Sequence, residues 1–271
     1  MSDIVLSAGV RSNLLQLQNT SELITSTQTK LATGRRVNSA LDNPINYFTA
    51  QSLNVRANDL NALLDTMSTG INTIQAANNG ITAITKLVQS AQSLVSQAQQ
   101  TSDTTVRATL ASQFDSIRTQ IDQLAGDAGI NGVNLLGGND LTITLNESAT
   151  STVTITAVND TTAGDLAINA SANGWAAGAD ITAASTELTA ALVKLRSQSQ
   201  ALSSTLQTVQ VRQDFTKAMI NTLNTGADNL TLADSNEEGA NLLALQTRQQ
   251  LSTTALSLAS QADQNVLKLF S

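Results

Sequence analysis

The side chains with the best spacing for catalysis or metal binding lie in two short acidic stretches. Glu237 and Glu238 are adjacent, and paired carboxylates can serve as general acid and base. Asp42 and Asn43 supply two oxygens of the kind that hard cations prefer, but no further carboxylates follow at calcium-loop spacing. Helix capping explains the glutamates better, because they precede a helix whose N-terminal end attracts negative charge. A turn before Pro44 explains the Asp-Asn pair better.

The chain has no histidine and no cysteine among its 271 residues. This excludes thiol nucleophiles, disulfides and metal sites built from Cys or His, and it removes the most common general base. The Asn-Gly pairs at 79–80 and 131–132 lack the G-x-G-x-x-G spacing of a nucleotide loop. Trp175, the single tryptophan, fits a hydrophobic plug more readily than a ligand platform. The sequence therefore predicts no enzyme activity, no cofactor and no metal.

Charge and hydropathy argue against two further classes of protein. The chain has 14 Lys and Arg and 21 Asp and Glu, which gives a net charge of −7. The sequence has no long run of like charges, and its small basic cluster is "GRR" at 34–36. Nucleic acid binding requires clustered Lys and Arg, so we do not expect it. No apolar run is long enough to cross a membrane, and the N-terminus lacks the basic region of a cleavable signal. On these features alone the protein would be cytoplasmic.

Hydrophobic periodicity predicts several long helices. Apolar residues recur at alternating steps of three and four over 4–33, 60–98, 106–124 and 181–230, and again near the C-terminal end. This is the heptad pattern of coiled coils. The single proline, Pro44, lies in "LATGRRVNSALDNPINYFTAQSL", where it must interrupt a helix. Gly34, Asp42 and Asn43 add helix-end and turn signals, so we expect a joint between two zones here.

One segment has a different periodicity. "LTITL" and "TVTIT" alternate apolar and polar residues around "NESATS", which predicts a β-hairpin near 141–158. The predicted fold is mainly α: a long antiparallel helical coiled-coil rod with a small β-hairpin and with its N- and C-terminal helices paired. We expect residues 1–45 and 232–271 to form one zone and residues 46–231 to form a helical core that carries the hairpin.

The terminal helices bury too little apolar surface to be ordered by each other alone. Ordering about 75 residues costs roughly 75–150 kcal/mol of backbone entropy, and many seam positions are Ala or Ser. We therefore predict that the two ends become ordered against other copies of the chain. The predicted self-assembly residues are Leu6, Val10, Leu14, Leu17, Ile24, Leu31, Ala255, Ala259, Ala262, Val266 and Leu269.

The stretch around Pro44 resembles the N-terminal signature of bacterial flagellins. The closing stretch "DSNEEGANLLALQTRQQLSTTALSLASQADQNVLKLFS" resembles their C-terminal signature, and "INGVNLL" before the hairpin also fits. The similarity covers residues 1–145 and 180–271, without the large central insertion of many flagellins. The sequence Asp42-Asn43-Pro44-Ile45-Asn46 at the joint resembles flagellins of the alphaproteobacterial kind.

The resemblance implies a structural subunit that self-assembles into the flagellar filament for motility. Residues 1–45 with 232–271 would form the inner tube, and residues 46–231 the outer shell. Flagellins leave the cell through the flagellar type III exporter without a cleaved signal, so the resemblance implies a secreted, extracellular protein instead of a cytoplasmic one. The implied partners are the chain itself, with or without other flagellins, an export chaperone at the C-terminal helix, and hook-associated and cap proteins. Nucleic acid and membrane insertion are not implied.

Two other functions are compatible with the same helices. A hook-associated junction protein of the flagellum would share both terminal seams, and a secreted helical adhesin would need a folded receptor-binding module. The short length of the chain and its "LATGRR" followed by "DNP" favour flagellin over the junction protein. No segment is long enough for a separate receptor-binding module.

The resemblance also locates the surface by which an animal Toll-like receptor senses flagellins. Residues 87–98 align with it, and Gln89 and Ala91 fall at arginine positions while Gln92 falls at a glutamate position. Loss of the arginine charges predicts loss of recognition, because charge-assisted hydrogen bonds are about twice as strong as neutral ones. A shift of three residues in the alignment would instead bring Lys86 to the first arginine position.

Overall fold

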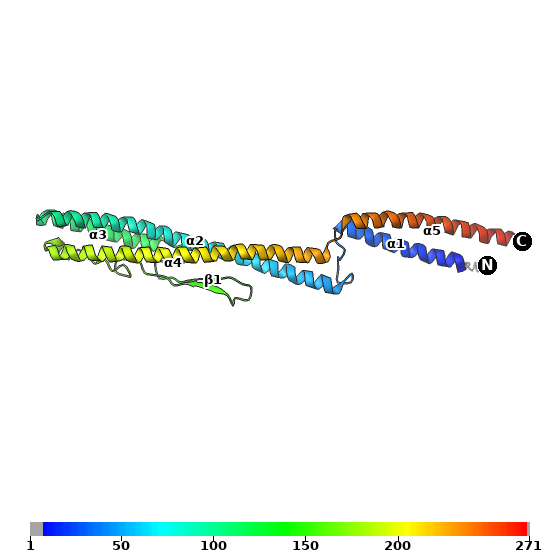
Figure 1. Cartoon of the computed structure of the whole chain (residues 1–271), viewed down its shortest axis with the longest axis horizontal. Helices are drawn as coiled ribbons and strands as arrows, with labels where there is room; N and C mark the ends of the chain where they lie inside the picture. The colour runs from blue at the N-terminus through cyan, green and yellow to red at the C-terminus, as the bar shows by residue number, and fades with distance from the viewer. Residues whose placement is uncertain (1–7, 270–271) are drawn as a thin grey trace. The chain divides into compact units, whose positions relative to one another are not determined.

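The computed structural model describes residues 8–269 and confirms a mainly α fold (Figure 1). Leu6 lies outside the described residues, as do the side chains of Val266 and Leu269. In chain order the elements are α1 (Ala8–Thr33), α2 (Pro44–Gln100), α3 (Thr104–Asp127), β1 (Leu141–Thr144), β2 (Thr152–Ile155), the short 3-10 helix η1 (Ala172–Trp175), α4 (Gly178–Thr231) and α5 (Ser235–Leu269). The hairpin and the pairing of the two terminal helices agree with the sequence prediction.

The chain divides into two compact units. Unit 1 comprises Met1–Val55 and Thr222–Ser271, and unit 2 comprises Arg56–Asn221, so α2 and α4 contribute to both. The zone boundaries expected from the sequence, at 45/46 and 231/232, lie ten residues closer to the chain ends than Val55 and Thr222. They lie instead two residues into α2, which begins at Pro44, and directly after Thr231, the last residue of α4.

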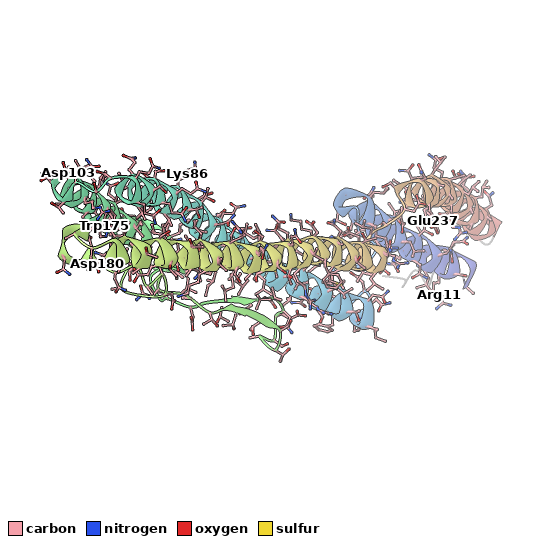
Figure 2. The ribbon with its side chains drawn as sticks, turned by 60° about the vertical axis from the view of Figure 1, so that its left-hand side comes forward. Arg11, Lys86, Asp103, Trp175, Asp180 and Glu237 are labelled. Carbon is pink, nitrogen blue, oxygen red and sulfur yellow. The ribbon has the colours of Figure 1, made fainter. Side chains whose placement is uncertain are left out.

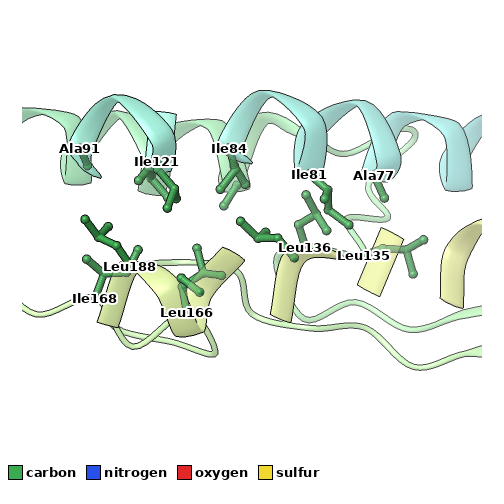
Figure 3. Packing of buried hydrophobic residues seen from close by; sticks show 14 of the residues in the cluster. Ala77, Ile81, Ile84, Ala91, Ile121, Leu135, Leu136, Leu166, Ile168 and Leu188 are labelled. Carbon is green, nitrogen blue, oxygen red and sulfur yellow. The ribbon is translucent and has the colours of Figure 1, made fainter. Parts of the chain in front are cut away.

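Unit 2 is built on two matched heptad seams. The residues Met67, Ile74, Ile81, Val88 and Val95 of α2, and Ile181, Leu188, Leu195, Leu202 and Val209 of α4, are all buried and recur every seventh residue. A strict seven-residue repeat keeps one stripe of each helix facing its neighbour. The third helix, α3, adds Phe114 and Ile121 to the same core. Figure 3 shows Ile81 and Ile84 of α2 directed toward Leu136 and the elements opposite.

Polar residues within these seams pair with each other across the two helices. The hydroxyl of Ser199 donates to Oδ1 of Asn78 over 2.7 Å, and Nε2 of Gln213 donates to the hydroxyl of Ser68 over 2.9 Å. A buried polar group without a partner is costly, so a slip of either helix would be penalised at both positions. The two contacts therefore fix the antiparallel register of α2 and α4, as single polar residues do in coiled coils.

Two glycines inside α2 allow the hairpin and its preceding loop to approach the helix closely. A Cβ at Gly70 would lie 2.4 Å from Cδ1 and 2.8 Å from Cγ1 of Ile143 on β1. A Cβ at Gly80 would lie 2.7 Å from Leu136 and 2.8 Å from Ala128. In the sequence these glycines read only as weak points of a helix. The structure gives their reason: a side chain there would collide with the layer that covers α2.

Trp175 is fully buried and packs on Phe114 of α3 with ring centroids 5.0 Å apart. It lies just before α4, near Asp180 (Figure 2). Its backbone has a φ of 60°, a conformation that bulky residues rarely adopt. The plug role is therefore the one that the structure supports, because the indole fills the core and presents no open face to a ligand.

Within unit 2, a row of charged side chains on α3 binds the segment between β2 and α4. Asp122 accepts hydrogen bonds from the backbone N–H (2.6 Å) and the hydroxyl (3.0 Å) of Thr162. One turn earlier, Arg118 donates to the carbonyl of Ile168 over 2.9 Å. Asp115 then accepts from the N–H and hydroxyl of Ser171. Charge-assisted bonds of this kind are stronger than neutral ones, so they order a loop that has little regular structure.

Asp160, in the same segment, is a buried acid with an incomplete set of partners. Nε2 of Gln198 donates to its Oδ1 over 2.9 Å, while Asp160 Oδ2 and Gln198 Oε1 are both buried and find no partner among the described residues. Burial raises the pKa of Asp160 to about 6; the Gln198 hydrogen bond and the charge of Lys194 oppose the rise, and the charge of Asp165 adds to it. A proton on Oδ2 would allow Asp160 to donate to Gln198 Oε1, which would satisfy both atoms.

The fit around Gly70 leads to a prediction about unit 2. The substitution Gly70→Ala should lower the free energy of unfolding by about 1–3 kcal/mol, because the new methyl group overpacks the buried Ile143. Adding Ile143→Ala should recover part of that loss, which a double-mutant cycle measured by urea unfolding will show as a favourable coupling.

Gly126 is the matched control for this experiment. It lies in α3 with nothing within 4 Å of the Cβ position, so Gly126→Ala should raise the free energy of unfolding by about 0.5–1 kcal/mol. Equal effects of the two alanine substitutions would contradict the close contact between α2 and the hairpin.

The burial of Asp160 leads to a pH prediction. Because its pKa is raised in the fold, the stabilisation is complete below the ordinary pKa of 3.8 and is lost as the pH rises through about 6. Relative to the parent chain, Asp160→Asn should therefore gain about 2 kcal/mol of unfolding free energy as the pH rises from 4.5 to 7.5. Urea unfolding at both pH values measures this, with the exposed Asp65→Asn as control; a pH-independent difference would contradict it.

Candidate functional site

The joint predicted around Pro44 lies in unit 1, where the segment between α1 and α2 runs beside the segment between α4 and α5. Gly34 follows α1 with a φ of 67°, the left-handed conformation that commonly ends helices. The N–H groups of Arg36 and Val37 both donate to the carbonyl of Thr231, over 2.8 and 3.3 Å, and the N–H of Ala233 donates to the carbonyl of Gly34 over 3.0 Å. The break after α1 and the break before α5 are thus hydrogen-bonded to each other.

Side chains of the "LDNP" stretch organise the start of α2. Asp42 Oδ2 accepts from the N–H groups of Asn38 and Ser39, each over 2.9 Å, and these bonds lower the pKa of Asp42. Asn43 Oδ1 accepts from the N–H of Asn46 over 3.0 Å and so caps the helix. Pro44 is the first helical residue, where a missing N–H costs nothing.

Charged side chains tie the same region together. Lys30 Nζ lies 3.1 Å from Glu238 Oε1 and joins α1 to α5, and Arg36 donates to the carbonyl of Asn229 at the end of α4. Asp234 caps α5 through the N–H of Asn236, and Glu237 lies in the first turn (Figure 2). Residues 8–269 contain no cluster of three or more acidic side chains arranged to hold a metal ion. These groups organise the ends of α1, α4 and α5.

The two terminal helices, α1 and α5, pack side by side, and each buries one stripe in the other (Figure 1). Of the predicted self-assembly residues, Val10 is buried and Leu17, Ile24 and Leu31 are half-buried on the face of α1 that packs on α5. These four residues are therefore used within the chain. Whether they also contact another copy stays a prediction.

The four other predicted self-assembly residues whose side chains the structure describes lie at or beyond the edge of that packed face. Leu14 is exposed on α1. On α5, Ala255 and Ala262 are exposed and Ala259 is half-buried, because α5 packs on α1 through residues such as Leu245 and Leu256. The exposed alanines belong to a face rotated by roughly a quarter turn from the packed one at 100° per residue. Whether they contact another copy stays a prediction.

The heptad prediction missed a second apolar face on α5. The outer leucine stripe consists of Leu243, Leu251 and Leu258, each 62–67% exposed, on the side of α5 that points away from α1. The neighbouring positions on this face, such as Ala244 and Thr254, carry no charge. The signal was present as leucines at spacings of eight and seven, but a single seam per helix does not include it.

A second exposed apolar surface lies at the joint. The joint stripe consists of Leu41, Ile45, Phe48 and Val55, which are between 52% and 95% exposed. The last three lie on one side of the first turns of α2. The opposite side of those turns is buried, as at Ala50.

The three positions aligned with the animal receptor surface differ in exposure. Gln89 is exposed, Gln92 is half-buried and Ala91 is fully buried in the core of unit 2. Only the two glutamines are therefore available to a partner. The expected loss of receptor recognition stays a prediction of the resemblance.

No helix within residues 8–269 is long and apolar enough to cross a membrane.

Comparison with known proteins finds flagellins. The family described as "Bacterial flagellin N-terminal helical region" matches residues 8–140. Flagellin FljM and Flagellin FljK of Caulobacter vibrioides are each 31% identical to the chain, over 100% of its length and 99% of their own. A flagellin of Brucella melitensis is 27% identical with the same coverage. Among solved structures, a Bacillus cereus flagellin has a TM-score of 0.48 at 19% identity, covering 55% of this chain and 86% of its own.

The matches to the flagellins of Caulobacter vibrioides and Brucella melitensis run from end to end of both sequences, and the chain that they match has the paired terminal helices, the capped joint and the helical core described above. The chain belongs to the bacterial flagellin family.

Proposed function

We propose that this chain is the structural subunit of a bacterial flagellar filament, and that it self-assembles with copies of itself through unit 1. The observation that carries the proposal is the outer leucine stripe on α5, together with the half-exposed Leu15 and Leu23 of α1. Fully burying a leucine stabilises by about 1.5–3 kcal/mol. Five large side chains left largely in water on one helix pair are therefore a strong drive for association, repeated in every subunit.

The proposal extends to location and partners. Residues 1–45 and 232–271 would form the inner tube and residues 46–231 the outer shell of a filament outside the cell, after type III export without a cleaved signal. An export chaperone would cover α5 before assembly, and hook-associated and cap proteins would meet the ends of the filament. The end-to-end similarity to flagellins supports a filament subunit over a junction protein or an adhesin. A structural role also accounts for a chain without histidine or cysteine.

The monomer should be most easily cut at its ends. α1 and α5 each bury one stripe only, whereas the helices of unit 2 share a core with α3 and the hairpin. Limited proteolysis of depolymerised protein should therefore remove residues near 1–45 and 235–271 first and leave a stable middle fragment. First cleavage in the hairpin turn at 146–151, with both ends intact, is the result that would contradict this.

A charge in the outer leucine stripe should abolish filaments without unfolding the subunit. Leu251→Asp would bury an unpaired carboxylate in each contact, at a cost of several kcal/mol per subunit. Electron microscopy should show no filaments from this variant or from a chain lacking residues 255–271. Gln246→Asp, at an exposed position of the same helix outside the stripe, should polymerise normally.

Circular dichroism of the monomers is the control, since both variants should keep the helical content and melting of unit 2. Normal filaments from Leu251→Asp would show that the stripe is not a contact surface.

A further inference from the structure

Two exposed apolar surfaces of unit 1, the joint stripe and the outer leucine stripe, have no partner among the described residues. Both are free of charged side chains. Three charged side chains lie beside the joint stripe: Asp42 accepts backbone hydrogen bonds from its own turn, Arg56 pairs with Glu147, and Asp59 is exposed one turn beyond Val55. A partner that covers Ile45, Phe48 and Val55 themselves is best apolar, because a charged group placed over these three side chains would lose its hydration without a counter-charge among them.

The two stripes also differ in shape in a complementary way. The joint stripe offers bulky branched and aromatic groups on one side of α2: Ile45, Phe48 one turn later, and Val55 two turns further on. On α5 the leucines are separated along the helix by small exposed residues, among them Ala244 and Ala255. Large side chains on one helix pack into the grooves that small residues leave on another.

We infer that the joint stripe of one copy packs on the outer leucine stripe of the next copy, so that each subunit offers one of each. This rests on the proposed function, since the occupant is a second copy of this chain. A stripe that met its own equivalent would close the assembly into dimers. Two unlike stripes that meet leave one of each unpaired at the two ends of the assembly, so growth continues. A filament subunit needs this open, head-to-tail contact.

The absence of cysteine from the chain makes a direct test possible. Filaments of a chain with Ile45→Cys and Leu251→Cys, treated with a short bismaleimide, should give a ladder of covalent oligomers on denaturing gels. Each single-cysteine chain should stay monomeric under the same treatment. A second pair, Phe48→Cys with Leu258→Cys, covers a shift in the register of the contact. The control pair, Asn54→Cys with Gln246→Cys, is exposed but outside both stripes and should give no ladder.

The outcomes separate the contact from the function. Filaments in which neither stripe pair forms a ladder would overturn the proposed contact and leave the filament function standing. Dimers from the Ile45→Cys chain alone would show that the joint stripe meets its own equivalent, which also overturns it. A parent chain that forms no filaments in salt would overturn the proposed function, and the contact with it.

A mixing experiment tests the same contact without cysteines. Phe48→Asp removes the joint stripe and keeps the outer leucine stripe, and Leu251→Asp does the reverse. Neither variant should elongate alone. In an equal mixture, the outer leucine stripe of the Phe48→Asp chain can pack on the joint stripe of the Leu251→Asp chain. Sedimentation should show pairs that do not grow further, because the pair has no intact stripe left to bind a third chain. Elongation by Phe48→Asp alone would exclude the joint stripe from the contact.

Discussion

A contact between two helices can bury only one stripe of each, and this limit governs how the two units differ. In unit 2, the most apolar stripes of α2 and α4 pack on each other, and α3 and the hairpin cover further apolar residues of these two helices. In unit 1, α1 and α5 also pair, but among the described residues no third element covers their outer faces. Several elements therefore cover the core of unit 2, although Val193, Val211 and Phe215 of α4 stay exposed. In unit 1 the pair of α1 and α5 leaves the outer leucine stripe exposed.

The close cover of α2 depends on positions where a side chain is missing. Gly70 and Gly80 weaken α2 as an isolated helix by about 1 kcal/mol each relative to alanine. They also let Ile143 and Leu136 reach the helix backbone, which buries both residues. Polar seam residues act in a similar way: Asn78 and Ser199 contribute little burial, but their hydrogen bond fixes which turns of α2 and α4 meet. These residues lower the helix propensity or the apolar burial of their own helix, and in return they fix how the neighbouring elements pack on it.

The sequence was sufficient for the elements whose signal is local. Seven-residue spacing predicts the buried seam from Met67 to Val95, and Pro44 with the turn signals of Asp42 and Asn43 predicts the break between the first two helices, because these residues act on their own backbone. The partner of Gly70 and the burial of Asp160 were not predictable, since they depend on loops that reach the helices from far along the chain. The outer leucine stripe was missed for a different reason. A heptad reading assigns one apolar face to each helix, and α5 has two.

The joint decides which face of α5 becomes the second one. Asp234 caps the helix, and the N–H of Ala233 is bonded to Gly34, so α5 begins at a fixed height beside the end of α1. Lys30 and Glu238 then set its rotation one turn further on. A change of one residue in this start would rotate α5 by 100° and turn Leu251 away from its present direction. The hydrogen bonds and the ion pair at the joint therefore determine which face of α5 is left exposed.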